Sequence, residues 1–261
     1  MSVRADYPLG TWTPASGAAP TRTRVLSQAR FDLLGVLRNG EQLLLTLIIP
    51  LVLLVAGSAF NLSGRTDASA INVITPGILA LAVMSTAFTS LAIAVGFDRR
   101  SGSLRLLGTT PMTRGNLLAA RSLSVAAVEV IQVILICTVA AALGWEPTPG
   151  YAPALTLLVL GTAAFAACGV ALAGVLRAEA TLAVANGIYL LLLIGGGTVV
   201  PVERLPGPLA ALATVLPSGA LGEGLRSVLT DGGGFPWFNL AVLASWAAVA
   251  SIVAARTFRW E

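Results

Sequence analysis

Residues 75–97 read TPGILALAVMSTAFTSLAIAVGF and contain no charged side chain. A helix needs about 20 predominantly apolar residues to cross the hydrocarbon core of a bilayer. In lipid a single segment can satisfy its own backbone hydrogen bonds only as a helix. The stretch therefore predicts a membrane-spanning helix.

Apolar runs of similar length lie on both sides of this stretch, at 42–60, 122–143, 153–176, 181–200 and 238–255. The 261-residue chain is 56% hydrophobic and only 11% charged, whereas soluble domains carry about 25% charged residues. The composition predicts an all-α polytopic membrane protein with six transmembrane helices. Pro50, inside the first run, is compatible with a kinked membrane helix.

The segment 201–237, between the fifth and sixth runs, contains five prolines and two apolar pieces at 209–216 and 220–229. Neither piece is long enough to span a bilayer. We interpret them as short re-entrant or interfacial helices before the last span; an ordinary outside loop is the alternative. The Gly195, Gly196 and Gly197 run indicates close helix packing or a local break.

Arginine is distributed unevenly between the two sides that six spans define. Of the 16 basic residues, all of them Arg, 13 fall in the N-terminal arm, the second-to-third loop, the fourth-to-fifth turn and the C-terminus. Cytoplasmic loops carry such an excess. Both termini and the second-to-third loop are therefore expected in the cytoplasm.

The N-terminal arm divides in two. Residues 1–22 are rich in Pro, Ala, Thr and Gly and lack a signal-peptide core, so we expect a disordered cytoplasmic tail followed by one permease-sized domain, 23–261. Residues 23–39 place Leu26, Ala29, Leu33 and Leu37 at helical spacing, with Arg30 and Arg38 off that stripe. The period predicts an interfacial amphipathic helix; a helical extension of the first span is the alternative.

The second-to-third loop, residues 98–121, reads DRRSGSLRLLGTTPMTRGNLLAAR and is the most charged part of the chain. Residues 101–107 can form a short helix that Gly108 ends, and Thr113 offers an N-cap for the helix that follows. The pattern predicts a rigid helix–turn–helix bracket. A generic positive loop is the alternative reading.

Catalytic patterns are missing from the sequence. It contains no His and no Lys, so it can form neither a P-loop nor a His-based catalytic or zinc site. Cys137 and Cys168 both lie in apolar runs and read as buried hydrophobes. We therefore expect no enzyme activity, no metal and no bound cofactor on this chain, and the basic charge does not indicate nucleic-acid binding.

Polar residues inside the predicted spans are candidates for a pathway or a subunit interface, because such residues are costly in lipid. Glu129 lies about 12 Å inside the third span at 1.5 Å per residue, and Gln132 follows one turn later on the same face. Burial with hydrogen bonding is an equal alternative for this pair. Asn186 and Tyr189 share a face of the fifth span, where packing is the more ordinary role.

Three stretches resemble type-two ATP-binding-cassette exporter permeases. The first is the 98–114 segment, with its acidic–basic start, its Gly-Ser-Leu and Leu-Leu pairs and its T-P-x-x-R element; Asp98 and Arg100 stand where the family usually has Glu. The second is the arm that ends at Arg38. The third is Leu216 and Pro217 followed by the E-G-L-R element at 223–226.

The resemblance implies the permease subunit of an ATP-driven exporter in a bacterial plasma membrane. A second permease, identical or related, and two ATPase subunits that bind ATP and Mg²⁺ would be its partners, within the lipid bilayer. The implied ATPase-coupling residues are Asp98, Arg99, Arg100, Gly102, Leu104, Arg105, Leu107, Pro111 and Arg114. The implied connecting helix carries Arg30, Leu33, Leu37 and Arg38, and Glu223 and Arg226 join Glu129, Gln132, Asn186 and Tyr189 as pathway or interface candidates.

The apolar spans favour hydrophobic or amphipathic cargo, such as a drug, antibiotic or lipid. Two other classes remain open from the sequence: a stand-alone secondary carrier, which would call for several intramembrane charges, and a non-transport membrane scaffold.

Overall fold

The computed structural model describes residues 17–60, 70–198, 200–230 and 232–257, and these ranges contain helices and no strand. The elements are, in order, α1 (Thr21–Arg38), α2 (Gly40–Leu43), the π-helix η1 (Leu44–Ile48), α3 (Ile49–Ala59), α4 (Ala70–Val83), the π-helix η2 (Met84–Ser90), α5 (Leu91–Ser101), α6 (Ser103–Gly108), α7 (Arg114–Ala142), α8 (Tyr151–Val175), α9 (Ala178–Gly195), the 3-10 helix η3 (Val202–Arg204), α10 (Gly207–Val215), α11 (Pro217–Leu229) and α12 (Trp237–Thr257). The predicted all-α class is confirmed.

Five helices in these ranges are long and apolar enough to cross a membrane. They are Ala70–Ser101, formed by α4, η2 and α5 end to end, and Gly115–Ala142, Tyr151–Val175, Ala178–Gly195 and Trp237–Thr257. They coincide with the second to sixth predicted spans. The first predicted span is also helical, as α2, η1 and α3, but its apolar part, Thr46–Ala59, is shorter. The helix lengths thus support five crossings directly.

Three predicted spans have different ends in the structure, and the third begins at Arg114 instead of residue 122. The second begins at Ala70 instead of residue 75 and continues past its apolar part to Ser101. The fifth ends at Gly195 instead of residue 200. The glycine run causes this early end, because Gly197 has a φ of +75°, which glycine adopts without the steric cost that a Cβ brings.

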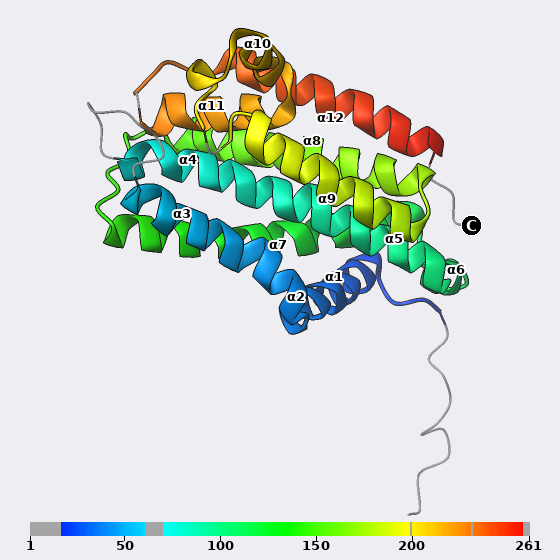
Figure 1. Cartoon of the computed structure of the whole chain (residues 1–261). Helices are drawn as coiled ribbons and strands as arrows, with labels where there is room; N and C mark the ends of the chain where they lie inside the picture. The colour runs from blue at the N-terminus through cyan, green and yellow to red at the C-terminus, as the bar shows by residue number, and fades with distance from the viewer. Residues whose placement is uncertain (1–16, 61–69, 199, 231, 258–261) are drawn as a thin grey trace, which may run out of the picture.

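The α4–η2–α5 helix lies at the centre of the bundle. Of its most apolar window, 83% is buried, whereas the corresponding share in the other four long helices is between 17% and 33%. It contacts α3, α7, α8, α9 and α11 along its length (Figure 1). Close approach to α8 depends on Gly169, where a Cβ would lie 2.8 Å from the carbonyl oxygen of Phe88.

Two short helices, α10 and α11, fill most of the segment between α9 and α12, as predicted from its two apolar pieces (Figure 1). Nearly all of α11 is buried, against α4, α8 and α12. By contrast, α10 leaves Leu209, Leu212 and Val215 exposed. The structure therefore integrates α11 into the bundle and leaves an apolar face on α10.

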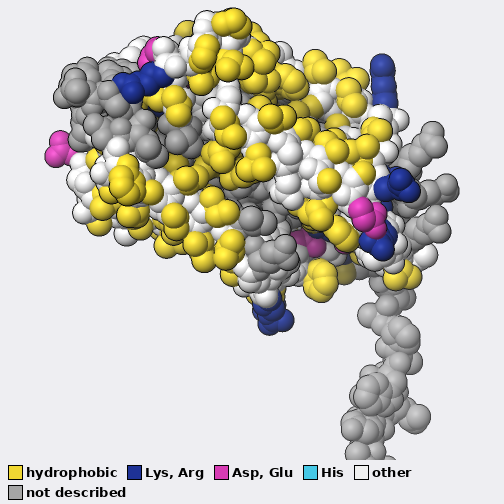
Figure 2. Space-filling model, viewed as in Figure 1, with side chains coloured by type: hydrophobic (Ala, Val, Ile, Leu, Met, Phe, Trp, Pro, Cys, Tyr) yellow, Lys and Arg dark blue, Asp and Glu magenta, His cyan; other side chains and the backbone are white. Residues whose placement is uncertain are grey.

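The outer surface of the bundle is apolar. Figure 2 shows hydrophobic side chains across the middle of the visible face and charged side chains towards its edges. Exposed apolar residues occur on α7, α8, α9 and α12, among them Val130, Val159, Leu191 and Ile252. Such a surface is stable only where lipid or another protein covers it, which agrees with a multi-pass membrane protein.

Candidate functional site

Helix α1 and the segment between α5 and α7 meet at an ion cluster. Arg121, at the start of α7, forms ion pairs with Asp98 on α5 and with Asp32 on α1, the latter at 3.2 Å from Nε to Oδ2. The Asp32 side chain is only 6% exposed and that of Asp98 28%. One guanidinium thus joins three helices, and two carboxylates share it.

Burial raises the pKa of the Asp32 carboxyl, an effect that the Arg121 cation and a hydrogen bond from Gln28 oppose and that the Asp98 charge adds to. The Gln28 amide donates to Oδ1 of Asp32 at 2.9 Å. Since two acids face a single cation, the cluster is electrostatically undercompensated. It is therefore sensitive to any movement that separates α1 from α7.

The loop itself is a bracket, as predicted. Gly102, with a φ of +72°, ends α5 and begins α6, and the Thr113 hydroxyl accepts a hydrogen bond from the backbone of Asn116 at 3.2 Å as the N-cap of α7. The short helix starts at Ser103 and not at residue 101. Ser103 fixes its first turn by donating to the Asp98 carbonyl at 3.1 Å. The bracket is thereby tied to the ion cluster.

Arg99 and Arg100, two further basic residues of this loop, bind different parts of the same end of the molecule. Arg99 donates to the carbonyls of Ala173 and Gly174 at the end of α8, and Arg100 pairs with the exposed Glu179 of α9. The Pro111 carbonyl accepts from Arg24 of α1. These contacts connect the loop to every neighbouring element.

Two further residues of the predicted coupling set are Pro111, which is exposed, and Leu107, which is half-buried; their neighbour Leu106 is 70% exposed. The side chains of Leu104, Arg105 and Arg114 lie outside the described part of the structure. Among the described residues, α6 and the turn that follows it therefore leave Leu106, Thr109, Thr110 and Pro111 at the surface.

The face of α1 that packs against the bundle differs from the predicted stripe. Ala29 is buried and Leu33 half-buried, but Leu26 and Leu37 are exposed, together with Arg30 and Arg38. The buried side of α1 is centred on Ala29 and the Asp32 side chain. Leu26 and Leu37 of the stripe stay exposed, which is compatible with the predicted interfacial helix, and an ion pair marks the contact with the bundle.

A pocket of about 430 Å³ opens between the α2–η1 segment, the η2–α5 segment and α9. It is lined by Asn39, Gln42, Thr46, Ser85, Thr89, Ser90, Ile93, Ala94, Phe97, Leu182, Asn186 and Tyr189. Both π-helices, η1 and η2, contribute to its wall. π-Helical turns frequently occur at functional sites, and the volume falls within the range of roughly 300–1,000 Å³ of small-molecule sites.

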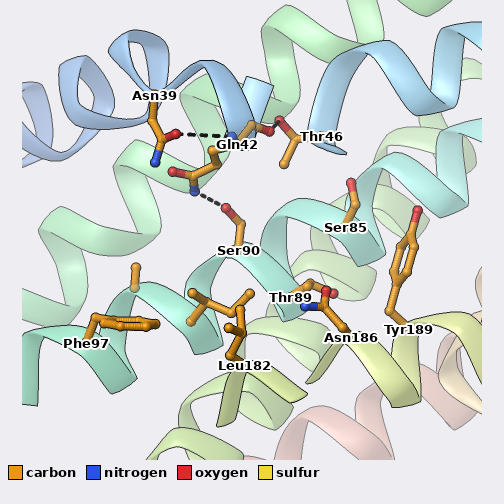
Figure 3. A pocket seen from close by; sticks show the side chains of 12 residues that line it. Asn39, Gln42, Thr46, Ser85, Thr89, Ser90, Phe97, Leu182, Asn186 and Tyr189 are labelled. Atoms are coloured by element: carbon orange, nitrogen blue, oxygen red, sulfur yellow. Dashed lines mark hydrogen bonds between the residues drawn. The ribbon is translucent and has the colours of Figure 1, made fainter. Parts of the chain in front are cut away.

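The pocket is polar without being charged. Eight of its twelve lining residues carry an amide or a hydroxyl, and none carries a formal charge. In Figure 3, Gln42 reaches Ser90 across one side, and Asn186 and Tyr189 of α9 form another. The Tyr189 hydroxyl and the Thr89 hydroxyl are buried and make no hydrogen bond among the described residues. These two groups can bind a ligand's polar atoms.

The predicted candidates inside the spans separate in the structure. Asn186 and Tyr189, whose shared face was noted from sequence, both line the pocket. Gln132 lies outside that wall, 1% exposed, bonded to Thr86 of η2 and to Thr46 of η1. Glu129 is also buried, and its Oε2 lies 2.6 Å from the Thr162 hydroxyl of α8. Glu129 and Gln132 therefore bond to different neighbouring elements and do not form one polar patch.

Glu223 and Arg226 are part of the packing of α11. Arg226 is 3% exposed and donates to the carbonyls of Val73, Gly197 and Thr198, and it pairs with Glu223. Glu223 also accepts from the backbone N–H of Val202 at 2.9 Å. The E-G-L-R element thus pins α11 to α4 and to the turn after α9, at a distance from the pocket wall.

Sequence reasoning missed Asp32, Arg121, Gln42 and Ser90. Asp32 carries a usable signal, because an acid on the inner side of an amphipathic helix has to find a cation. Gln42 and Ser90 carry no such signal, since they meet across 48 residues of chain. Only the packing of α2 against η2 brings the side chains of Gln42 and Ser90 together.

Comparison with known proteins gives two matches. The family described as ABC-2 family transporter protein matches residues 58–256 of the chain. The Bacillus subtilis (strain 168) protein named "Putative transport permease YvfS" is 25% identical over 167 residues, which cover 63% of this chain and 67% of that protein. Most of the pocket wall and the whole 98–121 bracket lie inside the family match.

Proposed function

Since the chain belongs to the ABC-2 family of transporter proteins, which confirms the resemblance seen at residues 98–114, we propose that it is the permease of an exporter driven by separate ATPase subunits. As a member of that family it is a membrane component of an ABC transporter. The ATPase partner, the direction and the cargo are the proposal. The sequence supports the division of labour, because without Lys this chain cannot build a P-loop.

The proposed ATPase contact is the exposed surface of α6 and the turn that follows it. Short helices transmit displacement where flexible loops do not; this one begins directly after Gly102 at the end of α5, and the turn that follows it ends at Thr113, the N-cap of α7. The Asp98–Arg121–Asp32 cluster carries the displacement to α5, α7 and α1 together. ATP and Mg²⁺ bind on the partner in this proposal.

The proposed topology has six crossings, with α2, η1 and α3 as the first, and with both termini in the cytoplasm of a bacterial cell. The asymmetric Arg distribution supports this orientation. α10 and α11 then lie on the opposite side, as a re-entrant pair before α12. A second permease, identical or related, completes the pore.

The cargo proposal rests on one observation, the uncharged polar wall of the pocket. A charged cargo group would lose its hydration there without gaining a counter-ion, which is costly in a low-dielectric site. An uncharged amphiphile would instead meet amides and hydroxyls together with the apolar side chains of Ile93, Leu182 and Phe97. We propose a neutral amphiphile with hydroxyl or amide groups as the cargo class.

The test uses the full chain with its co-purified ATPase in lipid nanodiscs. ATPase stimulation is measured with three amphiphiles of equal alkyl length that carry a sugar, a quaternary ammonium or a sulfate head group. We expect the sugar head group to stimulate, and Asn186→Trp, which fills the pocket, to abolish this. Val159→Trp, at an outward position 63% exposed on α8, serves as the matched control.

Two results would contradict the proposal. Failure of any ATPase to co-purify with the intact chain rules out the permease function. Equal stimulation by all three head groups, or equal loss in both Trp variants, rules out the pocket as a site for neutral cargo.

A further inference from the structure

Gln132 connects the two π-helices from behind the pocket. Its amide nitrogen donates to the Thr46 carbonyl of η1, and its amide oxygen accepts from the Thr86 hydroxyl of η2 at 2.9 Å. The side chain is 1% exposed and does not line the pocket. One amide group thus links two segments that are 40 residues apart in the sequence.

The Thr46 carbonyl lacks the donor that an α-helix would supply four residues later, because that residue is Pro50. In an α-helix the carbonyl of residue i accepts from the N–H of residue i+4, and proline has no N–H to give. Pro50 occupies that position relative to Thr46 and is buried just after η1. The amide of Gln132 therefore takes the place of a backbone donor.

The same arrangement occurs at the second proline within a helix. Pro76 lies four residues after Asn72, and the Asn72 carbonyl accepts from the Thr230 hydroxyl at 2.7 Å. In both places a polar side chain from a distant element binds the carbonyl that proline leaves open. At Thr230 the bond attaches the end of α11, whereas at Gln132 it attaches a wall of the pocket.

Both partners of Gln132 belong to segments that form the pocket. Thr46 of η1 lines it directly, and Thr86 lies between Ser85 and Thr89 of η2, which line it too. We propose that Gln132 is a positioning residue that sets the separation of η1 and η2 and thereby the width of the pocket. Its effect on cargo choice rests on the proposed function; its effect on pocket geometry does not.

The experiment reads pocket geometry without any cargo. In full-length chain with Cys137→Ala and Cys168→Ala, a single cysteine is placed at Ser85, which lines the pocket and is 4% exposed. Its rate of labelling by a small methanethiosulfonate is measured in nanodiscs. Gln132→Leu is expected to change that rate about fivefold or more, the change in an equilibrium that corresponds to one lost buried hydrogen bond.

Two further variants separate positioning from general loosening. Glu129→Leu removes another buried hydrogen-bonding side chain from α7, but its partner is Thr162 of α8, which does not line the pocket. It should leave the labelling rate within about twofold of the parent, because the bonds of Gln132 remain. Pro50→Ala restores a backbone N–H, so Gln132→Leu should change the rate less in that background.

Equal changes in the Gln132→Leu and Glu129→Leu proteins, or no change in the former, would overturn the proposal. If Gln132→Leu does not assemble, Thr86→Val removes one of its two bonds and must shift the labelling rate in the same assay. The effect of Gln132 on cargo choice is tested separately. If Gln132→Asn changes the labelling rate but leaves the head-group selectivity of ATPase stimulation unchanged, only the link between Gln132 and cargo choice is overturned. Failure of the pocket-filling variant would instead count against the proposed function.

Discussion

Replacing Arg121 by Met is the most informative change at the ion cluster. Met keeps much of the length and apolar volume of Arg but removes the cation that Asp32 and Asp98 share. The two carboxylates then face each other without a counter-ion among the contacts described for the cluster. Both the stability of the protein and its dependence on pH should change.

The loss of folding stability expected for Arg121→Met follows from how deeply the three charged side chains are buried. Removing one partner of a fully buried ion pair costs roughly 3–5 kcal/mol. Here Arg121 is 16% exposed, Asp32 6% and Asp98 28%, so we expect the lower end of that range, about 3 kcal/mol. In Asp32→Asn with Arg121→Met only the more exposed Asp98 remains unpaired, and the cost should fall to about 1 kcal/mol.

The pH dependence has a definite sign. In an unfolded chain the pKa of an Asp is about 3.9, and the folded pKa of Asp32 is already raised by burial. Without Arg121 the folded pKa of Asp32 rises further, so between about 3.9 and that folded pKa the folded state binds more protons than the unfolded state. The Arg121→Met protein should therefore regain stability as the pH falls through the raised pKa of Asp32 towards about 4.

The assay is the midpoint of thermal unfolding of the detergent-solubilised full chain at neutral and mildly acidic pH, for the parent, the single variant and the double variant. A single variant as stable as the parent at neutral pH, or a deficit that does not narrow on acidification, would refute the view that these three residues form a buried, undercompensated cluster.

Three other predictions concern packing and charge, all read by thermal stability and by monodispersity in detergent. Gly77→Ala should prevent correct folding, because its Cβ would lie 1.9 Å from the Thr198 carbonyl oxygen, whereas Gly187→Ala, with nothing within 4 Å, should be neutral; similar behaviour of the two would contradict the close contact. Arg226→Leu should cost about 3 kcal/mol or more, since it leaves buried carbonyls and Glu223 without their donor, and Arg226→Lys should recover part of this; a stable Leu variant would show that those bonds are not needed. Asp32→Asn should flatten the dependence of stability on pH between about 4 and the raised folded pKa, because it removes a group whose charged form is disfavoured on folding; an unchanged profile would contradict the pKa direction.

Length, composition and periodicity were sufficient for the secondary structure of most of the chain. The spans near 122–143, 153–176 and 238–255 each correspond to one helix with ends shifted by a few residues, except at the start of α7. The bracket at 98–121 was also readable, because Gly102 and Thr113 act through local backbone geometry. The ends of the second and fifth spans were not, since helices continue beyond apolar runs and stop where glycines permit a turn.

The candidate site was only partly readable. Asn186 and Tyr189 were found because one turn of helix places them on one face, and both line the pocket. The other walls come from η1 and η2, whose π-helical form has no recognised sequence signal in this chain. Glu129 and Gln132 share a face as expected, yet they bond to different helices, because α7 lies between those neighbours.

By itself the sequence determined that this chain is a helical membrane protein with a charged helix–turn–helix bracket and without the Lys that a P-loop requires. These properties depend on local quantities: apolar length against bilayer thickness, residue types required for catalysis, and caps and glycines within one turn. Only the tertiary structure decided that α4–η2–α5 is central, that Arg121 joins three helices and that Gln132 stands in for the missing N–H of Pro50. Each of these depends on which polar groups meet across distant segments, and in a low-dielectric interior such groups must find partners wherever packing brings them.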